Sequence, residues 1–401
     1  MVCCYRYPYD VDEQLIELVG SLVITKTEEY IVYCIVMAFC MPYYDFSSIN
    51  MSTEDVANFQ KGLLHDHVDR IMIGRILPLM FVLGLLGNLA FLFTMLRVKW
   101  MRTVTNYYLA NLAVADLLFL LFVVGDKILA YNTSELKGNM ILGQFGCIIK
   151  DLIVRITFYA SLALVTLVSL ERFYAICKPV QHRVLNGKKG TIQLIAMGWI
   201  LSAGFALILL PSHWHLCVTQ IVWLKIDGFH DLPSKLYTCN ALSSEWMHAS
   251  EGLTTVPFII ALVTNTYLYT NIIISLHVRA NSKVAKSTQS IEIRNQVALM
   301  LAINGIVFFL CLAPFQMMSF TRMIRNSLGM PGYLSPMVLG IVGWVLRILV
   351  YLNSIINPIV YTATSPRYRQ GFIVAFTCSE AEFRNKYNPA TTTEKTCNTK
   401  I

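Results

Sequence analysis

The sequence has few charged residues for its length. Asp, Glu, Lys and Arg make up 14% of its 401 residues, whereas a soluble globular protein carries about 25%. This shortage, together with an apolar fraction of 56%, argues against a water-soluble enzyme of this size. A disordered chain is excluded as well, because disorder requires low hydrophobicity and high charge.

Glycine, proline and internal repeats are also scarce. The chain has 21 glycines, 13 prolines and no internal period, which excludes collagen-like and repeat architectures. Its apolar stretches hold no nucleophile–base pair and no histidine metal set, so we do not expect an enzyme. The remaining class is an integral membrane protein.

Seven long apolar runs are present instead. Each is long enough to cross the hydrocarbon core as a helix, and none shows the alternation of a membrane β-barrel. The sequence therefore predicts an all-α membrane protein, a seven-transmembrane helix bundle over residues 71–377. The runs are Ile76–Leu96, Thr103–Gly125, Cys147–Ser169, Gly190–Leu210, Gly252–Leu276, Asn295–Thr321 and Ser335–Thr364.

Basic residues gather in alternate connections between these runs. They follow the first, third, fifth and seventh runs, whereas acidic residues dilute the basic charge of the other connections. By the positive-inside rule the basic connections are cytoplasmic and the N-terminus is extracellular. Arg70 and Arg75 conflict mildly with this orientation and are partly offset by Asp66 and Asp69. We expect a multi-pass protein of the plasma membrane.

The two ends of the chain are less regular. Residues 1–70 form a predicted extracellular region with an apolar stretch, Ile31–Tyr44, that is either signal-like or interfacial and is too short to span comfortably. Sequons at Asn50 and Asn132 fall on the predicted outer face and predict glycosylation. Residues 378–401 form a predicted cytoplasmic tail. Its threonines predict phosphorylation, and the alternative is a solvated tail.

Short motifs occur in nearly every run, in a fixed order. They are Gly87-Asn88, Asn-Leu-Ala-Val-Ala-Asp at 111–116, Glu171-Arg172-Phe173 with Pro179, Trp199, Phe308 with Cys311 and Pro314-Phe315, and Asn353–Tyr361. Together they resemble the rhodopsin-like (class A) G-protein-coupled receptors over roughly residues 71–377. The segments 103–108 and 351–354 look like those of the receptors for thyrotropin-releasing hormone, ghrelin and neurotensin.

The resemblance implies a polar cluster in the middle of the membrane. A carboxylate there is costly unless it has partners, and the family pattern places Asp116 beside Asn88, Ser161, Asn353, Ser354 and Asn357. The cluster either holds a sodium ion at Asp116 or is a hydrogen-bonded group without metal. No other cofactor is expected.

The resemblance also implies the residues of the activation switch. Glu171 pairs with Arg172 at rest, and Arg172 reaches the G protein in the active state. Pro358 is the hinge of the seventh helix, Tyr361 is the switch tyrosine and Tyr269 is its expected partner. The sixth helix contributes Phe308, Leu312 and Pro314. Three residues depart from the family pattern: Leu312 replaces a common Trp, Phe173 replaces Tyr, and Arg294 lies near the place of the usual acidic partner.

A disulfide and an eighth helix are implied as well. The family pattern pairs Cys147 with Cys239, and Cys217 is a rival partner in the same loop. Residues 367–376 are amphipathic and predict a short helix on the membrane surface. Cys378 follows it as either a palmitoylation site or a free thiol.

Charged and aromatic side chains near the outer ends of the runs predict the ligand site. Arg155 and Arg347 are expected to face one cavity, where they bind an anionic or polar ligand group, unless they pair internally, as Arg347 would with Asp126. The other candidates are Asp126, Asp151, Phe315, Gln316, Ser319, Arg322 and Tyr351. Val154 stands where amine receptors carry Asp, which argues strongly against an amine receptor, and the absence of the retinal lysine excludes an opsin. Residues 216–224 and 235–242 predict a hairpin over this site.

These expectations together predict a receptor for an extracellular (neuro)peptide. It would signal through a heterotrimeric G protein, by analogy of the Gq type, with arrestin, a receptor kinase and membrane lipids as further partners and no nucleic acid. An orphan chemoreceptor or a receptor for a lipid or small carboxylate is the alternative within this fold. A transporter or channel would show paired repeats or broken helices, and neither is seen.

Overall fold

The computed structural model describes residues 58, 60–185, 187–221, 223, 232–281, 289–330 and 335–377. The predictions for Ile31–Tyr44, Asn50, Cys378 and the tail threonines lie outside these residues. The chain divides into two compact units. The first contains residues 1–77, 126–151 and 210–247, and the second contains residues 78–125, 152–209 and 248–401.

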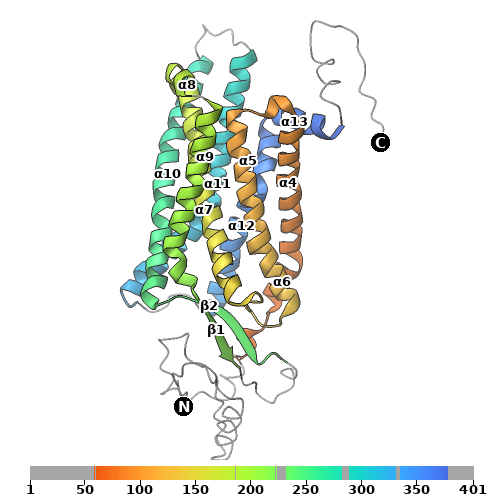
Figure 1. The fold of residues 1–401 in the computed structure, drawn as a ribbon, viewed down its shortest axis with the longest axis vertical. Helices are drawn as coiled ribbons and strands as arrows, with labels where there is room; N and C mark the ends of the chain where they lie inside the picture. Colours follow the sequence, from red (N-terminus) through yellow and green to blue (C-terminus); the bar gives the residue numbers. More distant parts are fainter. Residues whose placement is uncertain are drawn as a thin grey trace, which may run out of the picture. The chain divides into compact units, whose positions relative to one another are not determined.

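Helices account for nearly all of the regular structure in the described part of the chain (Figure 1). They are α3 (His67–Ile71), η2 (Met72–Ile76), α4 (Leu77–Arg97), η3 (Lys99–Met101), α5 (Val104–Phe119), η4 (Leu120–Gly125), α6 (Asp126–Thr133), α7 (Gly143–Cys177), α8 (Pro179–Leu185), α9 (Lys188–Leu209), η5 (Leu210–His213), α10 (Ser244–Asn281), α11 (Gln289–Ser327), α12 (Pro336–Thr364) and α13 (Pro366–Thr377). Two strands, β1 (His215–Gln220) and β2 (Lys235–Asn240), complete the set.

All seven predicted spans are helical. Six helices in the described residues are long and apolar enough to cross a membrane. The second span is the run of α5, η4 and α6, in which a π-helical turn separates two α-helices. The helical segment continues beyond the apolar run, which ends at Gly125, as far as Thr133. Asp126 and Lys127 end the apolar run, but charged side chains do not interrupt backbone hydrogen bonding.

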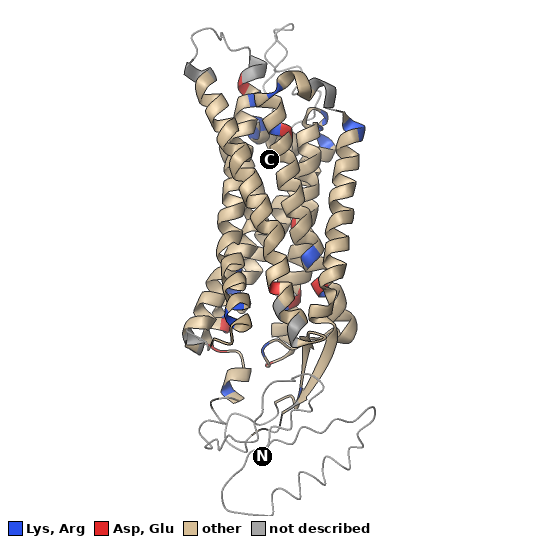
Figure 2. Cartoon of the chain, turned by 90° about the vertical axis from the view of Figure 1, so that its left-hand side faces the viewer, with Lys and Arg blue, Asp and Glu red and all other residues tan. Residues whose placement is uncertain are grey.

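The second unit is a bundle whose helices lie side by side (Figure 1). Large side chains that are almost wholly buried fill its centre, among them Phe91, Phe308, Tyr361 and Tyr368. The outer faces carry exposed apolar residues, such as Ile200 and Leu201 of α9, which suit contact with lipid. Figure 2 shows charged residues mainly toward the ends of the helices and very few along their middle. This distribution agrees with the predicted membrane bundle.

Two glycines let α10 and α11 approach each other closely. A Cβ atom built on Gly305 of α11 would lie 1.7 Å from the hydroxyl oxygen of Tyr269 of α10. In return, a Cβ built on Gly252 of α10 would lie 2.1 Å from the sulfur of Met323 of α11. Each helix therefore supplies one recess that receives a large side chain of the other.

The predicted hairpin and disulfide are present in the first unit. β1 and β2 pair antiparallel, with Leu216 opposite Cys239 and Cys217 opposite Thr238. Cys239 is bonded to Cys147 of α7, with their Cα atoms 5.6 Å apart. Cys217 is disulfide-bonded as well, so it does not replace Cys239 as the partner of Cys147.

A second contact in the first unit joins the segment before α3 to the loop after α6. Leu64 and Leu136 form an isolated antiparallel bridge, and the amide of Lys137 donates to the carbonyl of Leu63 at 2.8 Å. The Lys137 ammonium lies 2.9 Å from Asp66 and 2.8 Å from Asp69. We call this contact the outer clamp.

Candidate functional site

The first functional cluster surrounds Arg172, near the predicted cytoplasmic end of α7. Arg172 donates to both carboxylate oxygens of Glu171 and to the hydroxyl of Thr105 on α5. Glu171 also accepts from Thr105 at 3.2 Å, and the ring of His182 on α8 lies 3.3 Å from it. The predicted Glu171–Arg172 pair is therefore one part of a four-residue cluster.

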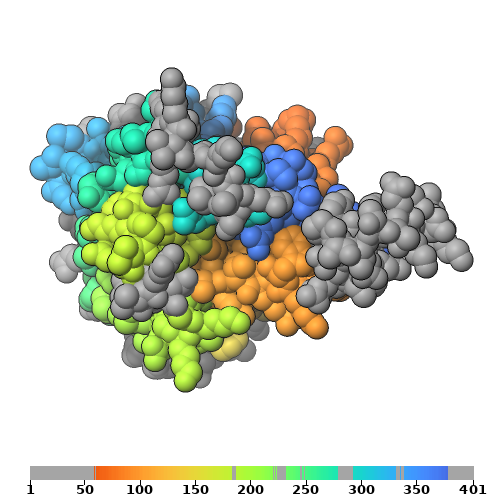
Figure 3. Space-filling view, turned by 90° about the horizontal axis from the view of Figure 1, so that it is seen from above, coloured from red at the N-terminus to blue at the C-terminus, as the bar shows by residue number. Residues whose placement is uncertain are grey.

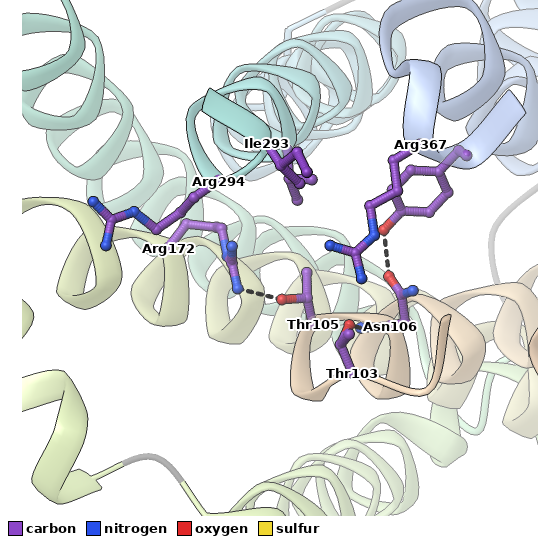
Figure 4. A pocket seen from close by; sticks show the side chains of 9 residues that line it. Thr103, Thr105, Asn106, Arg172, Ile293, Arg294 and Arg367 are labelled. Atoms are coloured by element: carbon purple, nitrogen blue, oxygen red, sulfur yellow. Dashed lines mark hydrogen bonds between the residues drawn. The ribbon is translucent and has the colours of Figure 1, made fainter. Parts of the chain in front are cut away.

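A cavity of about 470 Å³ opens beside this cluster. Its lining residues come from α5 and the turn before it, α7, α11 and α13: Thr103, Thr105, Asn106, Arg172, Ile293, Arg294, Val297, Arg367 and Tyr368. Figure 4 shows Arg172 reaching Thr105 from one side and Arg367 extending inward from the other. Arg294, which stands near the place of the usual acidic partner, lines this cavity too.

The predicted eighth helix, α13, forms one wall of the cavity. Arg367 donates to the carbonyl of Trp100 at 3.1 Å, and its guanidinium lies over the Trp100 ring. Tyr368 donates to Asn106, and burial raises the pKa of its hydroxyl. Seen from above, the blue end of the described chain lies next to an orange part near its beginning (Figure 3). These contacts fix α13 against the loop between α4 and α5.

The two tyrosines of the switch have separate partners. Tyr269 lies in the recess at Gly305, with its hydroxyl 2.8 Å from that of Ser169 on α7. Tyr361 follows Pro358, a proline inside α12, and packs against Phe91 and Tyr368. The predicted partnership of Tyr269 with Tyr361 stays a prediction.

The polar cluster forms around Asp116, which is almost wholly buried in α5. The amide of Asn357 donates to its carboxylate at 2.7 Å, and the hydroxyl of Ser354 also bonds to it. Asn88 donates to the carbonyls of Gly84 and Ser354. Ser161 and Asn353 are buried as well.

Within the described residues, two acceptors of this predicted set have no hydrogen-bond donor. They are the side-chain oxygens of Asn88 and Asn353, both buried. Oxygen atoms of carboxylates, amides and hydroxyls are the ligands that hard cations take. The donor set thus fits a small cation such as sodium.

The predicted switch residues of the sixth helix are buried. Phe308 and Leu312 of α11 belong to the main apolar core. Pro314 lies inside the same helix, two residues beyond Leu312. With an aliphatic side chain at position 312, the helix has no indole ring at the level where the family commonly has one.

Predicted ligand residues of the second unit lie on α7, α11 and α12. Arg155 donates to the hydroxyl of Thr254 on α10 at 3.2 Å. Arg347 is exposed and lies over the ring of Trp344, 5.4 Å from its centroid. The others are placed as follows: Arg322 lies 4.0 Å from Glu251, Gln316 accepts from Thr255, Tyr351 packs on Phe119, Ser319 is buried and Phe315 is partly buried.

The two acidic ligand candidates belong to the first unit and are both paired there. Asp126 forms an ion pair with Lys150, one helical turn beyond Cys147. Asp151 lies 3.3 Å from the ring of His213. These pairs connect α6 with α7 and α7 with η5. The Asn132 side chain, at the end of α6, is exposed and donates to the carbonyl of Ile128.

Several contacting residues were not among the predicted ones. Thr105, His182 and Arg367 near Arg172, Ser169 beside Tyr269, and Lys150 beside Asp126 are such cases. Arg367 begins the amphipathic stretch 367–376, and Thr105 lies in the segment 103–108 that carries part of the resemblance. Their contacts join residues from 11 positions apart, for His182 and Glu171, to 267 positions apart, for Arg367 and Trp100, and local sequence patterns do not reveal such pairs.

The comparisons with known proteins point in one direction. The model of a family described as the 7 transmembrane receptor (rhodopsin family) matches residues 87–361. The neuromedin-U receptor 2 of Rattus norvegicus is 27% identical over 323 residues, which cover 77% of this chain and 76% of that receptor. Galanin receptor 2a of Danio rerio is 26% identical, with 80% and 82% covered. The thyrotropin-releasing hormone receptor of Homo sapiens is 25% identical, with 74% and 76% covered.

Proposed function

The chain belongs to the rhodopsin family of seven-transmembrane receptors, and we propose that it transmits the binding of an extracellular peptide to a heterotrimeric G protein at the plasma membrane. The observation that carries this proposal is the Arg172 cluster at the edge of a cavity. The cluster lies on the side that the basic loops predict to be cytoplasmic. The names of the relatives, which are receptors for peptides, favour a peptide as the ligand.

The mechanism follows from the contacts of Arg172. In the resting state, Glu171 of α7 and Thr105 of α5 hold the Arg172 guanidinium by hydrogen bonds. A ligand that binds the active state more tightly shifts the equilibrium toward it. Outward movement of α11 then opens the cavity, and Arg172 turns toward the G protein. Val180 of α8, which is 79% exposed, would contact the same partner.

The ligand would be recognised by Arg155 and Arg347 in the second unit. Both guanidiniums make charge-assisted hydrogen bonds with an anionic or strongly polar group of the peptide. Arg155 also donates to the hydroxyl of Thr254 on α10 at 3.2 Å.

A sodium ion is the one cofactor that we propose. Asp116 would supply the negative charge, with Ser161 and the side-chain oxygens of Asn88 and Asn353 as further candidates. When bound, the ion would neutralise a carboxylate inside the membrane. The residues around it hold that carboxylate in place through Asn357 and Ser354.

Signalling beyond the first step belongs to the same proposal. We expect a G protein of the Gq type, which releases calcium, and shut-off by a receptor kinase and arrestin that act on the cytoplasmic tail. Phosphate groups added there would supply the charge that recruits arrestin.

A calcium-release screen tests the function. Cells expressing the full chain are exposed to a neuropeptide library, and we expect a saturable response that a Gq inhibitor abolishes. Arg155→Ala and Arg347→Ala should each raise the half-maximal concentration about tenfold or more, since a hydrogen bond to a charged group contributes roughly 1.5–3 kcal/mol. Arg70→Gln, an exposed arginine of α3, is the matched control.

The same screen separates the two candidate ligand classes. A response confined to small lipids or carboxylates would replace the peptide by the alternative class. A response to peptides that both arginine variants retain in full would contradict the assigned ligand residues. Surface expression of each variant is measured with an extracellular tag, so that poor trafficking is not mistaken for weak binding.

A further inference from the structure

The cavity beside Arg172 is rich in positive charge. Three of its nine lining residues are arginines, from α7, α11 and α13, and none of the nine is acidic. The hydroxyls of Thr103 and Thr105 lie along its floor in Figure 4, and Ile293 faces it from the opposite side. The charge of these arginines and the volume of the cavity suggest a binding site for an anion.

Arg367 has little compensation for its charge. It is half-buried, and within the described residues its one hydrogen bond goes to the neutral carbonyl of Trp100, while no carboxylate lies within ion-pair distance. Burial lowers the pKa of its guanidinium, and the positive charge of Arg172 lowers it further, whereas Tyr368 acts in the opposite direction. A buried charge without an opposite charge is unfavourable.

Glu171 does not supply the missing negative charge. Its two carboxylate oxygens are occupied by Arg172, Thr105 and the ring of His182. These partners lie on α7, α5 and α8, and none of them lies on α13. The Glu171 carboxylate therefore pairs with Arg172, one of the three arginines, and the cavity keeps an excess of positive charge.

We propose that this cavity binds the phosphate group of a small phosphate monoester, with Arg172 and Arg367 on opposite sides of it and Arg294 at the rim. The planar guanidinium fork matches phosphate oxygens in a bidentate manner. A phosphate monoester carries a charge of about −2 near neutral pH. This charge balances two guanidiniums, whereas the charge of one carboxylate balances only one. The cavity of about 470 Å³ leaves room for an attached ring, beside Ile293 and Val297.

The bound phosphate has a consequence that rests on the proposed function. It occupies the space that a G protein would enter and holds Arg172 inside the bundle. Phosphate binding should therefore favour the resting receptor. The same chemistry comes from two sources, a phosphoinositide headgroup of the inner leaflet or a soluble inositol phosphate.

Direct binding tests this site without peptide or G protein. The purified full chain in detergent is titrated with inositol 1,4,5-trisphosphate, and in lipid nanodiscs it is compared at equal charge with phosphatidylinositol 4,5-bisphosphate and phosphatidylserine. We expect saturable binding that Arg367→Gln weakens about tenfold or more and that Arg294→Gln weakens several-fold. Lys99→Gln, which removes an exposed positive charge of η3, should leave the affinity unchanged.

The outcomes separate the two sources and decide the proposal. Binding of the soluble probe supports a free anion, and binding only of the phosphoinositide in nanodiscs supports a lipid headgroup. Absence of both, or an equal loss in Lys99→Gln, would overturn the site. Thermal unfolding measurements show whether each variant is folded. If Arg367→Gln does not fold, the affinity of Arg294→Gln tests the site instead. Because this binding experiment uses no peptide, a failed peptide screen would not change its result.

Discussion

At the scale of single residues, the most constrained position is Gly305. Its missing side chain leaves the space in which the Tyr269 hydroxyl bonds to Ser169. The sequence alone predicted Tyr269 as a switch residue by resemblance, yet it did not single out Gly305. A glycine in a membrane helix is common, and only the packing shows which one a neighbour requires.

Gly305→Ala should destabilise the receptor. The new methyl group overlaps Tyr269, so the tyrosine must move and lose its bond to Ser169. We expect a loss of about 1–3 kcal/mol, seen as a lower melting temperature of the purified protein. Gly204→Ala of α9 is the control, because nothing lies within 4 Å of its added Cβ. Equal melting temperatures of the two variants would contradict the recess. Because Gly305→Ala already displaces the tyrosine, Tyr269→Leu should lower the melting temperature less in the Gly305→Ala background than in the unmodified protein.

Asp116 supports a prediction about sodium. If the cation binds the folded receptor, sodium chloride should raise the melting temperature above that in equimolar choline chloride by about 2 °C or more. Asp116→Asn should abolish the difference, since the amide keeps the shape of the side chain but has no charge. Equal melting in both salts for the unmodified chain would exclude an occupied site under these conditions.

At the scale of elements, hydropathy predicted where helices cross the membrane better than where they end. The hairpin and α13 were predicted within a few residues because turn residues and amphipathic spacing mark them. The apolar run of the second span ends at Gly125, whereas its helical backbone continues through Asp126 to Thr133. In the structure Lys150 neutralises the charge of Asp126 from α7, and such a partner is not visible in the local sequence.

The outer clamp should weaken in mild acid because of His65. Burial is the main cause that lowers the pKa of its ring; Asp69 opposes this shift, whereas Lys137 and Lys127 support it. The folded clamp thus favours neutral His65, so its full stability is present above the ordinary pKa of 6.5 and is lost as the pH falls through the lowered value. Asp66 and Lys137 do not titrate between pH 7.5 and 5.5, since pairing lowers the pKa of Asp66 and raises that of Lys137, although burial works against both shifts.

Hydrogen exchange of the Lys137 amide measures this opening. After correction for the intrinsic rate at each pH, we expect faster exchange at about pH 5.5 than at about pH 7.5. His65→Gln should remove the difference, whereas His67→Gln, an exposed neighbour, should keep it. An unchanged pH dependence in His65→Gln would assign the effect to another group.

At the scale of the whole molecule, orientation is the property that the sequence predicts most directly. The distribution of basic residues among the loops places the N-terminus outside. A tag at the N-terminus should bind antibody on intact cells, and a tag at the C-terminus only after permeabilisation. Replacing Arg97, Lys99 and Arg102 together by Gln should reduce the fraction in this orientation, because that change removes the basic cluster after the first run. The opposite staining of the two tags would contradict the orientation.

The reciprocal recesses of α10 and α11 restrict how these two helices can move. Met323 in the recess at Gly252 and Tyr269 in the recess at Gly305 oppose axial translation in either direction, because sliding would drive each side chain into the neighbouring backbone. Separation perpendicular to the axes meets no such obstacle, since each side chain can leave its recess the way it entered. The pair can thus open by tilting, while its register along the axes stays fixed.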